Sequence, residues 1–229
     1  MLATGGVRTL RRRLFLGAFI GLLHAGCKEK PPEALAGSGV PLTETRDVPP
    51  FTRLSVASRI EARVTIGEAS KLDFRGDNNL LPHLKSRVEN GELKLDTDVK
   101  VKPSIPLRVT FSVPQLEKAS VSKAAHVVIE GLNADTFEAR ASGGAKVVAS
   151  GSAQSLVIEG VEAGRFDFQK LSAQSATIRL EYGARAEMGY LEKLDVNLTG
   201  ATSVSYVGTP AIRKEIKSTT ARLVRRDER

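Results

Sequence analysis

The chain has 229 residues, of which 41% are hydrophobic and 5% aromatic, with one cysteine and a formal charge of +8. This length leaves room for one core-forming domain once a leader and a tail are set aside. The positive charge is concentrated at the two ends, because residues 1–26 hold four arginines and residues 213–229 are basic. The segment 27–212 between them is neutral, so the location of the charge excludes a nucleic-acid-binding protein.

Residues 1–26 have the pattern of an export signal. An arginine-rich start precedes the uncharged apolar run Leu14–Leu23, which is too short to span a bilayer with ease and is typical of a signal peptide. Within it, Arg12 and Arg13 followed by Leu14-Phe15-Leu16 match the core of a twin-arginine export signal. The alternative is an ordinary secretory leader that is rich in arginine.

Cys27 follows the small residues Ala25-Gly26 at the end of the apolar run, which resembles a bacterial lipoprotein signal. His24 departs from that motif, which usually carries Leu there. We predict that Cys27 is the lipidated N-terminus of the mature chain, which also explains a cysteine without a disulfide partner. Two or three acyl chains anchor a protein to a membrane effectively permanently. Lys28 after the cysteine fits the sorting pattern of outer-membrane lipoproteins.

Residues 27–46 are rich in Pro and Gly and poor in apolar groups, which predicts a disordered tether. A β-domain is expected over residues 47–224, with a basic tail at 225–229. Its first half has strand patterns at 51–56, 62–66, 72–75 and 107–113, and a short helical turn within 78–85. Asn90-Gly91 predicts a tight β-hairpin, and residues 119–129 form a degenerate first coil.

The second half is a repeat. Segments 137–149, 156–168, 176–188 and 194–206 align with starting points that step by 19, 20 and 18 residues. Alternate positions form apolar columns, the first of which is Phe137, Leu156, Ala176 and Leu194, and small-residue corners such as Ser142-Gly143-Gly144 interrupt each segment. Alternation marks strands with one buried face. The pattern predicts an all-β solenoid with coils of about twenty residues, each of two short strands and two turns. A β-sandwich with evenly spaced strands is the alternative.

Residues 47–222 resemble the bacterial family named "putative auto-transporter adhesin, head GIN domain". The resemblance rests on the Phe51 strand, the Asn90-Gly91 hairpin, the Ser/Thr-Gly-Ala corners and, most specifically, the ending Tyr206-Val207-Gly208-Thr209-Pro210. It implies a right-handed β-helix-like solenoid and a role in cell-surface adhesion, which is a fold-level analogy. The chain departs from the family pattern in corners that lack the Ser/Thr-Gly-Ala residues, such as Lys123-Ala124-Ala125, and in having no following membrane barrel.

Candidate catalytic groups are sparse. His83 and His126 have no recognisable Ser–His–acid arrangement around them, and Asp96-Thr97-Asp98 lies in a lysine-flanked loop that favours a solvated turn over a cation site. We therefore expect no enzyme activity, no metal and no cofactor. A carbohydrate-active β-helix enzyme is the runner-up, and a ligand-free envelope scaffold is the third alternative.

One outward column is basic. The position just after each corner is His126, Lys146, Arg165 and Arg185, then Ser203. We call the first four residues the basic stripe. Stacked at the strand spacing of about 4.8 Å, they form either a solvated column partly neutralised by Asp167 and Glu187 or a site for an anionic polymer or lipid headgroup.

These features together predict a lipid-anchored envelope binding or adhesion module, exported and delivered to the outer membrane. Its expected partners are the membrane, through the N-terminal anchor, and a polysaccharide or another envelope component. A second copy is a further candidate partner, because a solenoid end at Ala211–Val224 would expose a strand edge.

Overall fold

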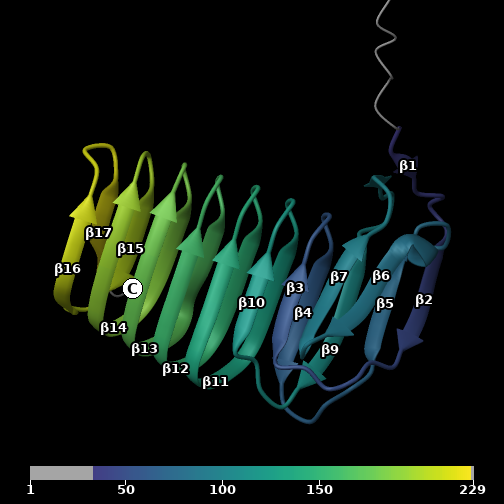
Figure 1. Cartoon of the computed structure of the whole chain (residues 1–229), viewed down its shortest axis with the longest axis horizontal. Coiled ribbons are helices and arrows are strands. Elements are labelled where there is room, and N and C mark those ends of the chain that lie inside the picture. Colours follow the sequence, from purple (N-terminus) through teal and green to yellow (C-terminus); the bar gives the residue numbers. More distant parts are fainter. Residues whose placement is uncertain (1–32, 228–229) are drawn as a thin grey trace, which may run out of the picture. The chain divides into compact units, whose positions relative to one another are not determined.

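The computed structural model describes residues 33–227 (Figure 1). The predicted signal peptide, Arg12, Arg13 and Cys27 lie outside the described residues. Within residues 33–227, no helix is long and apolar enough to cross a membrane.

The described chain is built almost wholly of strands (Figure 1). The N-terminal part holds β1 (Leu35–Ala36), β2 (Pro41–Arg46), β3 (Arg53–Val56), β4 (Glu61–Ile66), β5 (Leu72–Asp77), the 3-10 turn η1 (Leu81–His83), β6 (Leu84–Glu89), β7 (Glu92–Thr97), β8 (Val101–Lys102) and β9 (Arg108–Val113). The coils hold β10 (Lys118–Val121), β11 (His126–Ala141), β12 (Lys146–Gly160), β13 (Arg165–Glu181), β14 (Arg185–Thr199), β15 (Ser203–Val207), β16 (Ala211–Lys217) and β17 (Arg222–Arg226). The predicted helical turn and the Asn90-Gly91 hairpin are confirmed by η1 and the antiparallel β6–β7 pair.

The predicted solenoid is confirmed, because β10 to β15 stack in parallel and in the expected register. Phe137 pairs with Leu156, Leu156 with Ala176, and Ala176 with Leu194. These four side chains are buried, as are the alternate residues that follow them in each strand. Rings of Phe137, Phe166 and Phe168 pack inside the coils, with centroids 5.9 Å apart for the last two. The apolar columns therefore form one continuous core.

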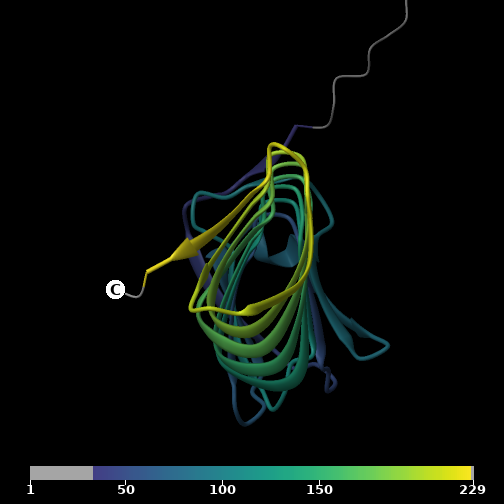
Figure 2. The same ribbon diagram turned by 90° about the vertical axis from the view of Figure 1, so that its left-hand side faces the viewer.

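Each coil differs from the prediction in having one sharp corner instead of two turns. β11, β12, β13 and β14 each run without a break from one corner to the next. Viewed along the stack, the coils are pointed at the corner and rounded opposite it, where each strand bends (Figure 2). The two short strands expected in each coil are thus halves of one bent strand, because a gradual bend keeps the ladder of parallel hydrogen bonds largely intact.

The corners are regular four-residue turns. Two successive central residues have positive φ in most corners, whether or not they are glycine, as at Gly143-Gly144 and Glu162-Ala163. The amide N–H of the fourth residue donates to the carbonyl of the first, over 3.1 Å from Ala145 to Ser142. This geometry is a type I′ turn, which normally favours Gly or Asn at its centre.

Variation in coil length is confined to the bend. The register between neighbouring strands shifts there and nowhere else in the β11–β12, β12–β13 and β13–β14 pairs. Gly151 lies at such a shift with φ of +125°, and a Cβ there would be 2.1 Å from the carbonyl oxygen of Leu132. Bulges at the bend therefore explain why the repeat steps by 19, 20 and 18 residues.

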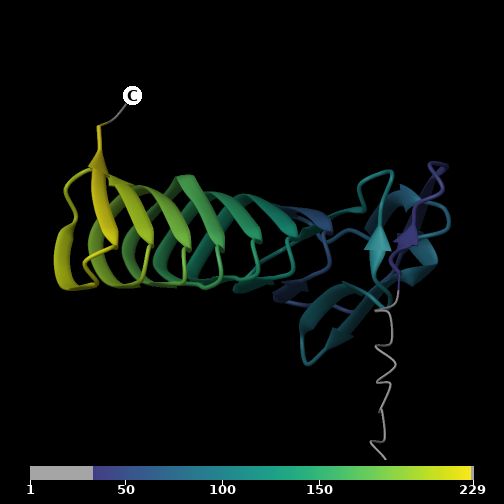
Figure 3. The same ribbon diagram turned by 90° about the horizontal axis from the view of Figure 1, so that it is seen from above.

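The N-terminal end is closed by β6, β5 and β2, which pair antiparallel with their neighbours. One side of the stack continues through β3, β7 and β6, and the other through β4, β9, β5 and β2. These strands lie at one end of the row of coils, and β16 and β17 lie at the other (Figure 3). Leu80, Leu81 and Leu84, at and beside η1, are fully buried. Their apolar side chains therefore close the core at this end.

The predicted disordered tether is wrong from residue 33 onward. β2 pairs along its whole length with β5, and β1 pairs with β8. The buried carboxylate of Asp77 accepts hydrogen bonds from the amides of Gly39, at 2.8 Å, and of Ser104 and Ile105, at 3.0 Å each. Residues remote in sequence hold this polar segment in place, although its own composition favours disorder.

Arg46 fastens the end of the same segment. Its guanidinium lies 4.4 Å from the centre of the Phe74 ring and donates to the carbonyl of Leu84 at 2.6 Å.

At the other terminus, the predicted basic tail is also partly wrong, because Arg225 and Arg226 belong to β17, which pairs with β15.

Candidate functional site

The residues of the basic stripe lie side by side, in the register that the repeat predicts. His126 pairs with Lys146, Lys146 with Arg165, and Arg165 with Arg185 across β11 to β14. The column continues to Ser203 and then to Arg222 of β17. These side chains emerge just after the corner, on the side of the stack that β4 and β9 continue.

The charges within the stripe are unequal. Lys146 Nζ lies 3.5 Å from Asp167 Oδ2 and is partly neutralised. Arg165 and Arg185 are exposed, and neither forms an ion pair with another residue of the described chain. Glu187, which could have neutralised them, instead lies 3.7 Å from Arg226. Two adjacent guanidinium groups are therefore left for an external anion.

His126 adds no charge to the stripe at neutral pH. Partial burial lowers the pKa of its imidazole, and the nearby Lys146 lowers that pKa further, while Glu61 acts in the opposite direction. Its Nε2 is buried and has no hydrogen-bond partner among the described residues. The structure thus brings His126 into the predicted column but places it there as a neutral side chain.

The opposite side of the coils carries a neutralised counterpart, which we call the ion-pair ladder. Lys118 pairs with Glu138 at 3.1 Å, Arg140 with Glu159 at 3.1 Å, and Arg179 with Glu159 at 3.2 Å. Burial opposes ionisation of Glu138, but hydrogen bonds from Lys118 and Arg140 hold its pKa below the usual value. Acidic and basic groups alternate here across the coils, whereas on the stripe Lys146, Arg165 and Arg185 follow one another.

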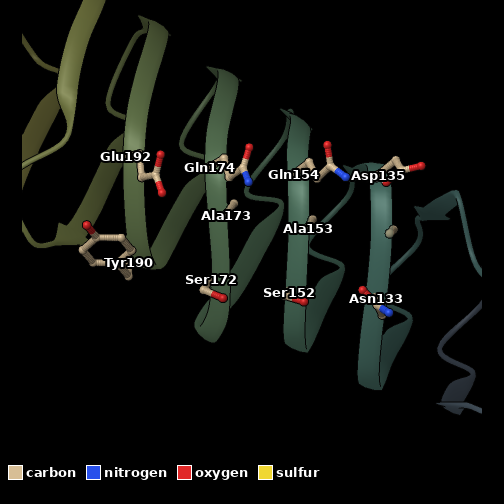
Figure 4. A pocket seen from close by; sticks show the side chains of 11 residues that line it. Asn133, Asp135, Ser152, Ala153, Gln154, Ser172, Ala173, Gln174, Tyr190 and Glu192 are labelled. Carbon is tan, nitrogen blue, oxygen red and sulfur yellow. Dashed lines mark hydrogen bonds between the residues drawn. The ribbon is translucent and has the colours of Figure 1, made fainter.

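A surface that the sequence did not predict lies at the bend (Figure 4). Two rows of outward side chains cross β11 to β14 there and enclose a volume of about 320 Å³. One row is Asn133, Ser152, Ser172 and Tyr190. The other row is Asp135, Gln154, Gln174 and Glu192. Between them, Ala134, Ala153 and Ala173 form the floor. We call this surface the bend trough.

The bend trough was missed because its residues fall between the aligned segments of the repeat. Residues 133–136 precede Phe137, and residues 152–155 precede Leu156. Their signal in the sequence is a column of amide and hydroxyl side chains directly before each apolar column, but length variation at the bend obscures it.

The candidate catalytic and cation-binding groups are engaged in structural contacts. The carboxylate of Asp98 lies 2.9 Å from His83 Nδ1 and 3.0 Å from Lys85 Nζ. Asp96 accepts a hydrogen bond from Ser58 and lies 3.0 Å from Lys123 Nζ. Across residues 33–227, no group of three or more His, Cys, Asp or Glu side chains is placed to hold a metal ion.

Comparisons with solved structures support the fold. A crystal structure described as a "putative adhesin" from Bacteroides fragilis NCTC 9343 superposes with a TM-score of 0.68 at 19% identity, covering 84% of this chain and all of the other. A "putative lipid binding protein" from Parabacteroides distasonis ATCC 8503 gives a TM-score of 0.55 at 14% identity, covering 85% of this chain and all of the other. At these identities the likeness is one of fold.

The search of curated proteins finds no match to this chain. The family model for "putative auto-transporter adhesin, head GIN domain" matches residues 50–210, from before the first strand of the core to the Tyr206–Pro210 ending. Because this match covers most of the described chain, the protein belongs to the auto-transporter adhesin head GIN domain family.

Proposed function

We propose that the protein is an exported, lipid-anchored adhesion module of the cell envelope that binds an anionic envelope polymer through the basic stripe. The description of its family as adhesin heads supports an adhesive, non-catalytic role. The leader pattern and the small residues before Cys27 support export and lipidation. The related structure described as lipid-binding supports a binding module more generally.

The observation that carries the proposal is the contrast between the two sides of the coils. On the ion-pair ladder, Arg140 and Arg179 both pair with Glu159, and Arg140 also pairs with Glu138. On the stripe, Arg165 and Arg185 point outward from neighbouring strands with no acidic partner among the described residues. Like charges stacked in adjacent strands disfavour each other by some tenths of a kcal/mol. A polyanion laid along the column would remove that repulsion and form paired guanidinium contacts.

Binding of the protein to heparin, as a probe polyanion, tests this contact surface. We expect the double variant Arg165→Gln/Arg185→Gln to weaken binding about tenfold or more, and wild-type binding to fall steeply with added salt. The matched control is Arg140→Gln/Arg179→Gln, which removes the same charge from the ladder. Equal weakening by both doubles, or unchanged binding in the stripe variant, would contradict a specific stripe site.

The anchor is tested separately, by the mass of the mature N-terminus purified from membrane fractions. We expect a diacyl or triacyl increment on Cys27 that disappears in Cys27→Ala, together with release of the variant from the membrane. An unmodified N-terminus in the wild type would show that the protein is not a lipoprotein, while leaving the stripe measurement unaffected.

A further inference from the structure

The bend trough continues into a neighbouring hollow. A second hollow of about 640 Å³ adjoins it and shares Asn133, Ala134 and Asp135 as a common wall. It exists because the coil before β11 has no strand at the bend: β4 pairs with β11 only up to Glu130, and β10 pairs with it only from Glu138. The two hollows together form a path along the direction in which the coils stack, which suits an extended chain better than a compact ligand.

The chemistry of the trough differs from that of the stripe. Its central coils present Ser152, Gln154, Ser172 and Gln174, whose hydroxyl and amide groups both donate and accept hydrogen bonds. One of these donors is already used, because Gln154 Nε2 donates to Asp135 Oδ1 at 2.6 Å. Lysine and arginine are absent from the lining of the 320 Å³ part, whereas Arg53, Glu117, Lys118 and Glu138 line the adjoining hollow. The acidic groups, Asp135 and Glu192, lie on the outermost of its four strands (Figure 4). The lining of the 320 Å³ part, which is the bend trough as defined above, disfavours a polyanion and matches a neutral chain rich in hydroxyl groups.

Tyr190 supplies an aromatic surface at the far end of the same trough. Its side chain is exposed although it is a large ring, with 54% of the residue accessible. Gly208 lies against it, and a Cβ on that glycine would be 3.3 Å from Tyr190 Cδ2. Because Gly208 has no side chain, no Cβ crowds the ring from this position. Exposed tyrosines combine a flat apolar face with a polar tip.

We propose that the bend trough binds an extended chain of neutral sugars lengthwise. Tyr190 stacks on the apolar face of one ring, and each coil offers hydroxyl or amide groups to the next sugar. The strand spacing of about 4.8 Å repeats these groups at a distance comparable with the length of one sugar unit. This site is independent of the basic stripe and of the anionic ligand proposed for it.

Titration calorimetry of the protein with neutral oligosaccharides tests the proposal. The probes are cello-, malto- and chito-oligosaccharides from two to six sugars long. We expect one of the three series to bind, with affinity rising with length and changing little with salt. Tyr190→Ala should weaken that binding about tenfold or more, as loss of an aromatic anchor does at other interfaces. Gln154→Ala/Gln174→Ala should weaken it as well.

Two matched controls separate this site from the rest of the surface. Tyr182→Ala removes the other highly exposed tyrosine, which lies at a corner with 71% of the residue accessible, and it should leave sugar binding unchanged. Arg165→Gln/Arg185→Gln should weaken heparin binding, as predicted above, without affecting the sugar. The proposal fails if none of the three series binds, or if Tyr190→Ala and Tyr182→Ala have the same effect.

Discussion

The coils and the N-terminal end are stabilised in different ways. In the coils, apolar residues recur in columns such as Val147, Phe166, Ala186 and Val204, and each coil is equivalent to its neighbours. The N-terminal end depends on single contacts that occur once, above all the three amides around Asp77 and the position of Arg46 over Phe74. A periodic structure distributes its stability over nearest-neighbour interfaces, whereas the closed end concentrates it in a few polar groups.

The largest expected effect comes from breaking a column in the middle of the coils. Ile178 is buried between Ile158 and Val196. Ile178→Asn should destabilise the domain by about 4 kcal/mol or more, since it leaves both a cavity and an unpaired amide. Because each coil supports the next, amide hydrogen exchange should accelerate in β12 and β14 as well as in β13.

Thr177→Asn places the same side chain on the exposed face of the same strand. It should change the free energy of unfolding, measured by urea denaturation, by no more than about 0.5 kcal/mol. If exchange in the Ile178 variant accelerated only within β13, the coils would not be coupled as the comparison requires.

The second largest expected change in stability comes from a substitution of Asp77 at the N-terminal end. Burial alone would raise the pKa of Asp77, but hydrogen bonds from the amides of Ile105, Gly39 and Ser104 outweigh it and hold the pKa below its ordinary value of 3.8. Asp77→Asn should cost about 2–3 kcal/mol at neutral pH, because an amide cannot accept all three donors as a carboxylate does.

The pH dependence follows from the direction of that shift. The stabilisation is complete above the unfolded-state pKa and is lost as the pH falls through that value toward the lower folded-state pKa. The difference in unfolding free energy between wild type and Asp77→Asn should therefore shrink below about pH 4. Asp73→Asn, on the exposed face of the same strand, is the control, and a gap that stays constant with pH would rule out ionised Asp77 as its origin.

The smallest expected change in stability comes from a substitution at a corner of the coils. Ala163 has φ of +62°, a conformation that costs an L-residue about 1–2 kcal/mol, whereas glycine loses about 0.5–1 kcal/mol of entropy. Ala163→Gly should therefore stabilise the domain by about 0.5 kcal/mol and raise Tm by about 1–2 °C. Ala201→Gly, at a corner position without positive φ, should destabilise it, and a decrease in Tm for both variants would contradict the argument.

The same comparison explains what could be predicted from the sequence. Alternation and spacing predicted the coils, the buried columns and the register that aligns Lys146, Arg165 and Arg185, because these follow from local periodicity. The ordering of residues 33–46 could not be predicted from their composition, since Asp77, Asn79 and Phe74 hold them from a distance. The neutralisation of Lys146 and the lowered pKa of His126 depend on side-chain positions that spacing does not determine.

The bend trough could not be predicted from the periodicity of the sequence either. Its rows lie where the coil length varies, so that Ser152 and Ser172 align only after the register shift between Val148 and Ser150 is placed. Irregular positions of a repeat are therefore the places where surface chemistry is hardest to see in a sequence.

The hydrogen bonds around Asp77 have a mechanical consequence if the N-terminus is anchored and the coils bind a ligand as proposed. Tension entering at residue 33 reaches the β1–β8 pair and the loop at Gly39 before it reaches any coil. The amides of Ser104 and Ile105 are held by the same carboxylate, so the pull is shared with a segment more than sixty residues away. Acidification, by protonating Asp77, would weaken this junction, whereas the buried columns that stack the coils are apolar and do not titrate.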